Sequence, residues 1–80
     1  MKVRPAIAAG LARHEIDAGP DDTAETLRER LNDRYLEDVR RLKARQVQGE
    51  IPLKEYAVHV QVLKESYPLL ALPLSLWVED

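Results

Sequence analysis

The sequence lacks cysteine, and this absence removes two common ways of stabilising a small domain. The 80-residue chain can form neither a disulfide nor a thiolate zinc site. Its two histidines offer little for a structural metal, so we expect no metal and no cofactor. A domain of this size buries only ~60–65% of the surface that its unfolded chain exposes. Self-association is therefore the expected source of additional stability.

Other features that the sequence lacks limit the composition of its core and the partners it can bind. Phenylalanine is absent and aromatic residues make up 5% of the chain, so aliphatic side chains must form the core. The net charge of −2 is too close to neutral to indicate nucleic acid or a membrane surface from overall electrostatics. No apolar run approaches the ~18 residues of a membrane-spanning helix. We expect a cytoplasmic protein without a membrane partner.

What the sequence does contain is a long amphipathic stretch with no internal proline. Apolar side chains recur at three- and four-residue steps along one face, namely Leu27, Leu31, Tyr35, Leu36, Val39 and Leu42. Asp22 and Glu25 have the spacing of a capping box, and Gly49 suits the end of a helix. The pattern predicts one long central helix, about 22–48. Its polar face predicts four ion pairs: Glu25–Arg28, Arg30–Asp33, Arg34–Asp38 and Glu37–Arg41.

A second helix is predicted after the turn that contains Pro52. The apolar residues of one helical face are Leu53, Tyr56, Ala57, Val60 and Leu63. They predict a helix over about 52–67 that runs antiparallel to the first. The strict alternation in residues 58–62 also fits a strand, and the helix is favoured because its face covers more residues. In a helix, Val58 and Val62 lie on a second face, which indicates a further contact.

The two ends of the chain differ from this central hairpin. Residues 1–21 form either a short helix, over about 5–17, or an arm that becomes ordered against a partner. Residues 68–80 form an apolar tail in which Pro68 and Pro73 prevent one regular helix. We expect the tail to be an extended or one-turn segment that lies in a groove, with Trp77 as an anchor.

The hairpin resembles a known family of interaction domains. Residues 39–64 read VRRLKARQVQGEIPLKEYAVHVQVLK: a basic helix with a leucine, a Gly-x-Ile turn and a Glu-Tyr start to the next helix. This order is similar to the short C-terminal helical-hairpin domain of many bacterial proteins, the SHOCT type. The matching positions are Leu42, Gly49, Ile51, Glu55 and Tyr56. The sequence departs from that pattern at Pro52, where a hydroxyl cap is usual. The resemblance implies an interaction or oligomerisation module without catalytic residues.

Groups that could carry chemistry are sparse. Four carboxylates stand four residues apart on the long helix and could act as acid and base or as metal ligands: Glu25, Glu29, Asp33 and Glu37. A solvated face balanced by arginines is the favoured interpretation. His14 and His59 have acidic neighbours in Asp17 and Glu55, and a surface role is favoured for both. The sequence therefore predicts no enzyme.

Together these patterns predict a single all-α domain over residues 1–80 that forms a homodimer or a larger helical assembly. The predicted function is a non-enzymatic protein–protein interaction or oligomerisation module. Its predicted contact residues are Val58, Val62, Leu69, Leu70, Leu72, Leu74, Leu76 and Trp77. The alternative is a nucleic-acid-associated accessory factor that uses the densest basic run, Arg40, Arg41, Lys43 and Arg45. Basic residues at this place also complement the dipole at the end of the long helix.

Overall fold

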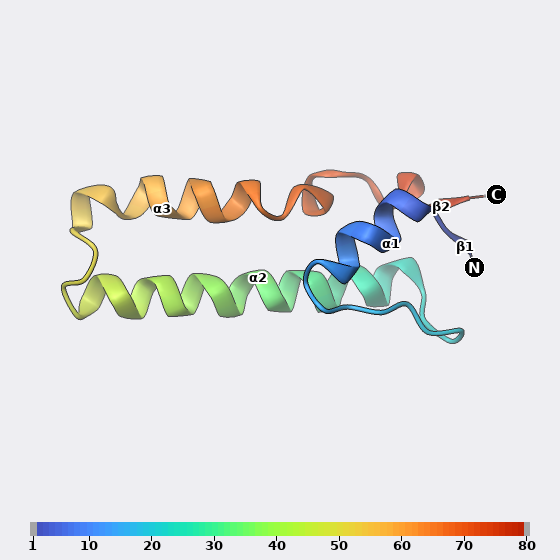
Figure 1. Cartoon of the computed structure of the whole chain (residues 1–80), viewed down its shortest axis with the longest axis horizontal. Coiled ribbons are helices and arrows are strands. Elements are labelled where there is room, and N and C mark those ends of the chain that lie inside the picture. Colours follow the sequence, from blue (N-terminus) through green and yellow to red (C-terminus); the bar gives the residue numbers. More distant parts are fainter. Residues whose placement is uncertain (1, 80) are drawn as a thin grey trace.

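An antiparallel pair of helices, α2 (Ala24–Val47) and α3 (Leu53–Glu65), forms the length of the molecule (Figure 1). The structure is a computed structural model that describes residues 2–79. A short helix, α1 (Pro5–Ala12), crosses the end of the pair that lies away from the α2–α3 turn. The molecule measures 47 × 18 × 16 Å along its principal axes. Within the described residues, no helix combines the length and apolar character needed to cross a membrane.

The long helix begins one residue later than the capping box predicts. Thr23 is the N-cap, and its hydroxyl accepts a hydrogen bond of 3.1 Å from the backbone N–H of Thr26. The predicted cap at Asp22 is wrong. Its carboxylate instead accepts from the N–H of Gly19 at 2.7 Å and pairs with Arg30 at 2.9 Å. The predicted glycine stop is confirmed, because Gly49 has a φ of 84°, a left-handed conformation that favours glycine.

Residues 58–62 are helical, which decides between the two interpretations of this segment. Helix α3 begins after Pro52, whose φ of −58° leads the chain into the first turn. It ends at Glu65, where the predicted helix continued to residue 67. The hydroxyl of Ser66 bonds back to the carbonyl of Leu63 at 2.6 Å and helps to close the last turn.

The apolar tail folds as two single turns followed by a strand. The turns are the 3₁₀ helices η1 (Pro68–Ala71) and η2 (Leu74–Leu76). Strand β2 (Val78–Glu79) then pairs antiparallel with β1 (Lys2–Val3), so the described ends of the chain lie side by side. The prediction of an all-α fold is correct for the three α-helices and omits this small sheet. Strands of two residues are too short to produce a periodic pattern.

The core lies at the end of the molecule where α1 and the tail meet α2 (Figure 1). Its buried residues are Ile7, Leu11, Ile16, Ala24, Leu27, Leu31, Tyr67, Leu69 and Trp77. Nearer the α2–α3 turn, only Leu42 and Ile51 are buried among the described apolar residues. No residue of α3 is buried. The hairpin therefore has a well-covered end and a thinly covered end.

Of the four ion pairs predicted for the polar face of α2, the structure forms one. Glu37–Arg41 forms at 3.9 Å. Two arginines of the predicted pairs reach residues before the helix, since Arg30 binds Asp22 and Arg34 binds Glu15 at 3.2 Å. These contacts tie the segment between α1 and α2 to the side of the long helix.

Candidate functional site

The structure places two of the predicted contact residues of the tail, Leu69 and Trp77, inside the molecule. Trp77 is fully buried and Leu69 is buried beside it in the core. The backbone N–H of Arg4 also donates to the carbonyl of Trp77 at 3.0 Å, which ties this part of the tail to the start of the chain. Trp77 and Leu69 are therefore core residues, and the prediction that they face a partner is corrected.

The rest of the tail is covered to different degrees. The partly buried residues that pack against the core are Leu70, Leu72 and Leu74. Leu76 is 44% exposed and is the tail leucine most open to solvent. The groove that the sequence predicts for the tail is therefore supplied largely by the chain's own α1 and α2.

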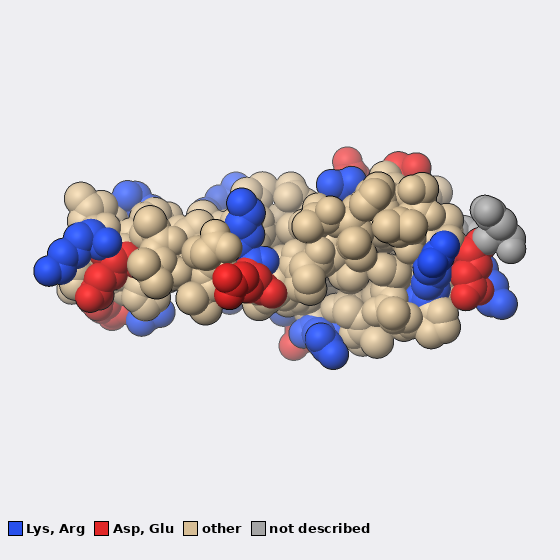
Figure 2. Space-filling model, turned by 90° about the horizontal axis from the view of Figure 1, so that it is seen from above, with Lys and Arg blue, Asp and Glu red and all other residues tan. Residues whose placement is uncertain are grey.

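The other predicted contact residues lie on the outside of the hairpin. Val58 is 64% and Val62 61% exposed, one helical turn apart on α3. The partly buried residues of α3 lie on other sides of the helix. We define the α3 outer face by five exposed residues: Lys54, Val58, Gln61, Val62 and Glu65. Figure 2 views the molecule from the α3 side. The surface along α3 and over the tail is mostly uncharged in this view, and a few charged side chains interrupt it.

Charged residues are arranged differently on the two long helices. Helix α3 carries four lysine and glutamate side chains, all near its ends: Lys54, Glu55, Lys64 and Glu65. Within residues 2–79, none of them forms an ion pair. Arginines of α2, in contrast, pair with carboxylates of α2 or of the adjoining loops. The charges of α3 are thus available for contacts outside the described chain.

The basic run of α2 is engaged within the chain. Arg40 pairs with Glu37 at 3.6 Å, and Arg45 pairs with Glu50 at 3.1 Å. Arg41 contacts carboxylates of the same helix at 3.8 and 3.9 Å. Lys43 donates to Gln46 at 3.0 Å and lies 5.2 Å from the ring centre of Tyr56. Neutralised cations release fewer counterions from a phosphate backbone, so this geometry does not favour the nucleic-acid alternative.

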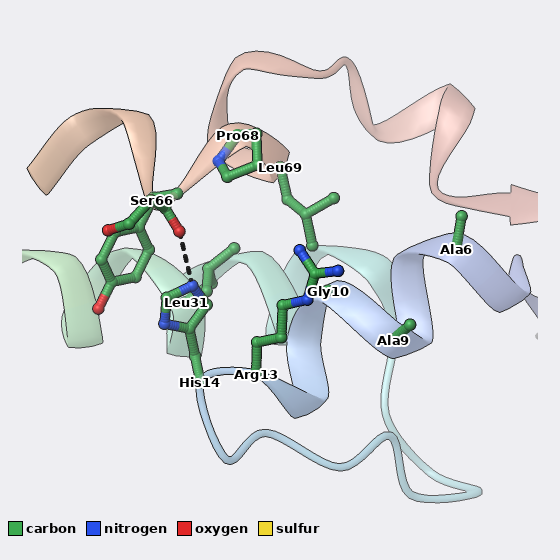
Figure 3. Close-up of a pocket in the computed structure, with 10 residues that line it drawn as sticks. Ala6, Ala9, Gly10, Arg13, His14, Leu31, Ser66, Pro68 and Leu69 are labelled. Atoms are coloured by element: carbon green, nitrogen blue, oxygen red, sulfur yellow. Dashed lines mark hydrogen bonds between the residues drawn. The ribbon is translucent and has the colours of Figure 1, made fainter. Parts of the chain in front are cut away.

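A cavity of about 290 Å³ lies between α1 and η1 (Figure 3). Its apolar lining includes Ala6, Ala9, Gly10, Leu31 and Leu69. Gly10 permits the close approach of α1 to η1, because a Cβ atom there would lie 2.8 Å from Cδ1 of Leu69. Figure 3 shows the side chains of Arg13 and His14 extending from the end of α1 toward η1.

His14 belongs to a network that joins α1, α2 and the end of α3. Its Nε2 lies 2.9 Å from the carbonyl oxygen of Ser66, and its ring stacks on that of Tyr67 with centroids 4.0 Å apart. The hydroxyl of Tyr67 donates to Asp38. These partners differ from the acidic neighbour predicted for His14, since the contact depends on the fold rather than on spacing along the chain.

The chemistry of this network is that of a structural contact. Burial raises the pKa of Tyr67 to about 12, and the hydrogen bond and negative charge of Asp38 act in the same direction. The positive charges of Arg34 and Arg41 oppose the rise. A phenol with this pKa keeps its proton at neutral pH, so it links α3 to α2 and is poorly suited to proton transfer.

The four carboxylates predicted along α2 do not converge. Glu25, Glu29 and Asp33 border an open depression with Arg28, while Glu37 pairs with arginines further along the helix. Within residues 2–79, no three or more side chains of the metal-binding types are placed to hold a metal ion.

The chain matches no family model, no curated protein and no solved structure. The resemblance of residues 39–64 to the helical-hairpin domain therefore stays a prediction.

Proposed function

We propose that this chain is a homo-oligomerisation module that carries out no reaction of its own and associates through the α3 outer face. The observation that carries the proposal is the exposure of α3 to solvent. This helix of 13 residues has no buried side chain, while Val58 and Val62 remain well exposed on it. Most helical stability in proteins comes from packing an apolar face, so a helix with so little cover gains from a partner.

The total exposed surface supports the same conclusion. A compact monomer of 9.1 kDa exposes ~4,900 Å², whereas this chain exposes 5697 Å². The excess of ~800 Å² equals the area that one partner contributes to a protein–protein interface of standard size. The radius of gyration of 14.8 Å likewise exceeds the ~12 Å of a compact chain of this length.

The strength of the association follows from the side chains. Covering Val58 and Val62 on two copies contributes on the order of 4 kcal/mol, since each valine is already partly buried. Association itself costs on the order of 4–15 kcal/mol. The aliphatic stems of Lys54 and Gln61 must therefore add apolar contact. Because these contributions and costs nearly balance, we expect a weak dimer, with a dissociation constant far above the nanomolar range.

The test is the solution mass over a concentration series, measured by sedimentation equilibrium. The variant Val58→Lys/Val62→Lys should remove the concentration dependence of the mass, because it places charge in the centre of the face. Val47→Lys is the matched control, since this valine is 71% exposed on α2 and lies outside the face. Circular dichroism would verify that each variant folds.

Two results would contradict the proposal. One is a wild-type chain that stays monomeric up to millimolar concentration. The other is an association that the double lysine variant leaves unchanged.

A further inference from the structure

The α3 outer face has a pattern that is complementary to itself. We infer that two copies pair through α3 in antiparallel orientation, about a two-fold axis near residue 60, with Lys54 of each copy bound to Glu65 of the other. The inference rests on the proposed function, because it needs the same face to associate. It adds the orientation of the copies and the residues that select the partner.

The valines set the position of the axis. In an antiparallel pair, residues whose numbers are equally far from the axis lie opposite each other. With the axis at residue 60, Val58 of one copy faces Val62 of the second copy, and the symmetry repeats the contact. Since a helix rises ~1.5 Å per residue, an axis displaced by half a turn would separate these side chains. The exposed valines therefore pack together in one register.

The charges agree with this register. Lys54 and Glu65 lie on the same flank of the valine pair, because successive residues of a helix are ~100° apart. In an antiparallel pair this flank meets its own counterpart. Lys54 then lies within ~2 Å of Glu65 of the second copy along the helix axis. Each side chain is free of ion pairs within residues 2–79, so two symmetric pairs can form.

The opposite flank is compatible with the same arrangement. There Glu55 lies beside Ser66 of the second copy, and Glu65 of that copy, which is level with Glu55, lies on the other flank. A parallel pairing of α3 would instead bring this flank against the opposite flank of the second copy, where Lys54 would meet Glu55 and Glu65 would have no cation. Only the antiparallel arrangement therefore pairs Lys54 with Glu65, and exchanging these two charges distinguishes the two orientations.

The experiment exchanges the two charges and measures the dimer dissociation constant by sedimentation. Lys54→Glu alone and Glu65→Lys alone each turn two attractions into two repulsions, and each should weaken the dimer about tenfold at low salt. Mixing the two variants should restore the affinity, because both cross-pairs of the mixed dimer then have opposite charges. The double exchange in one chain should restore it as well. Added salt should shrink all these differences.

Lys64→Glu is the control, since Lys64 is an unpaired lysine of α3 that lies away from the valine pair. Single exchanges that bind like wild type, or a mixture that does not recover, would overturn the antiparallel pairing. If Val58→Lys/Val62→Lys still abolishes association in that case, the proposed function stands. If the double lysine variant also has no effect, both fail.

Discussion

At the scale of single residues, Tyr67 joins separate parts of the chain through different kinds of contact. Its ring stacks on His14 and meets the edge of Tyr35 at a centroid distance of 5.3 Å. Its hydroxyl donates to Asp38 of α2. The residue sits where α3 ends and the tail begins, so it holds the tail and α1 in place relative to the hairpin. Its protonation state should therefore affect the stability of the fold.

The first prediction concerns Tyr67 and alkaline pH. Because the pKa is raised from 10.0 to about 12 on folding, the unfolded chain loses this proton at lower pH than the folded chain. The folded state binds more protons in that interval, so the stabilisation is complete below pH 10 and is lost as the pH rises toward 12. Tyr67→Phe should lower the free energy of unfolding by ~1–3 kcal/mol at neutral pH and flatten this alkaline decline.

Urea unfolding at several pH values, followed by circular dichroism, measures the effect. Tyr56→Phe is the control for loss of a tyrosine hydroxyl, because Tyr56 lies near the turn and contacts Lys43. An alkaline decline that is equally steep in wild type and Tyr67→Phe would show that Tyr67 is not its source.

Sequence reasoning at this scale succeeds where the chemistry is local. Gly49 is identified correctly because a left-handed residue after a helix favours glycine whatever surrounds it. The N-cap is misplaced by one residue because Asp22 and Thr23 are both good caps. Arg30 and the N–H of Gly19 bind the carboxylate of Asp22 and leave the cap to Thr23. Those competing partners become visible only in the fold.

At the scale of the elements, the tail is an internal part of the domain. Trp77 is enclosed by the core, and η1 lies against α1 where Gly10 leaves room for Leu69. The apolar composition of the tail correctly predicts that the tail packs against another surface. It does not show that α1 supplies the cover, because this pairing joins opposite ends of the chain and leaves no periodic signal. The sequence predicts the position of Val58 and Val62 on an exposed face more accurately, because this position follows from helical spacing alone.

The second prediction tests the tail as a core element. Trp77→Ala should lower the free energy of unfolding by ~3–5 kcal/mol, since it empties the centre of a packed cluster. Leu76→Ala should cost far less, because Leu76 is partly exposed. Trp77→Phe should be milder than Trp77→Ala, in part because the Nε1 of Trp77 is buried without a hydrogen-bond partner within residues 2–79. Thermal unfolding measures all three variants.

A Trp77→Ala variant with wild-type stability would contradict the placement of the tail in the core. A Leu76→Ala variant as unstable as Trp77→Ala would instead point to the backbone of the tail as the source of stability.

At the scale of the whole molecule, buried surface is divided unevenly between the two ends. The end with α1, the tail and the small sheet holds the core, and the end with the α2–α3 turn holds little buried surface. Helix α3 extends over the thinly covered end, so the surface that gains most from a partner lies away from the core. A second copy on α3 would therefore stabilise the end of the molecule that its own chain supports least.

This arrangement predicts the shape of the dimer. The midpoint of α3 lies nearer the turn than the core (Figure 1), so antiparallel pairing about residue 60 places the two cores at opposite ends. The longest dimension of the dimer should then exceed the 47 Å of one chain. Parallel pairing would keep the cores together and the length near that value.

Small-angle X-ray scattering distinguishes the antiparallel from the parallel dimer, with Val58→Lys/Val62→Lys as the monomer reference at a radius of gyration close to 14.8 Å. A dimer no longer than the monomer would exclude the antiparallel arrangement while leaving α3 as the interface.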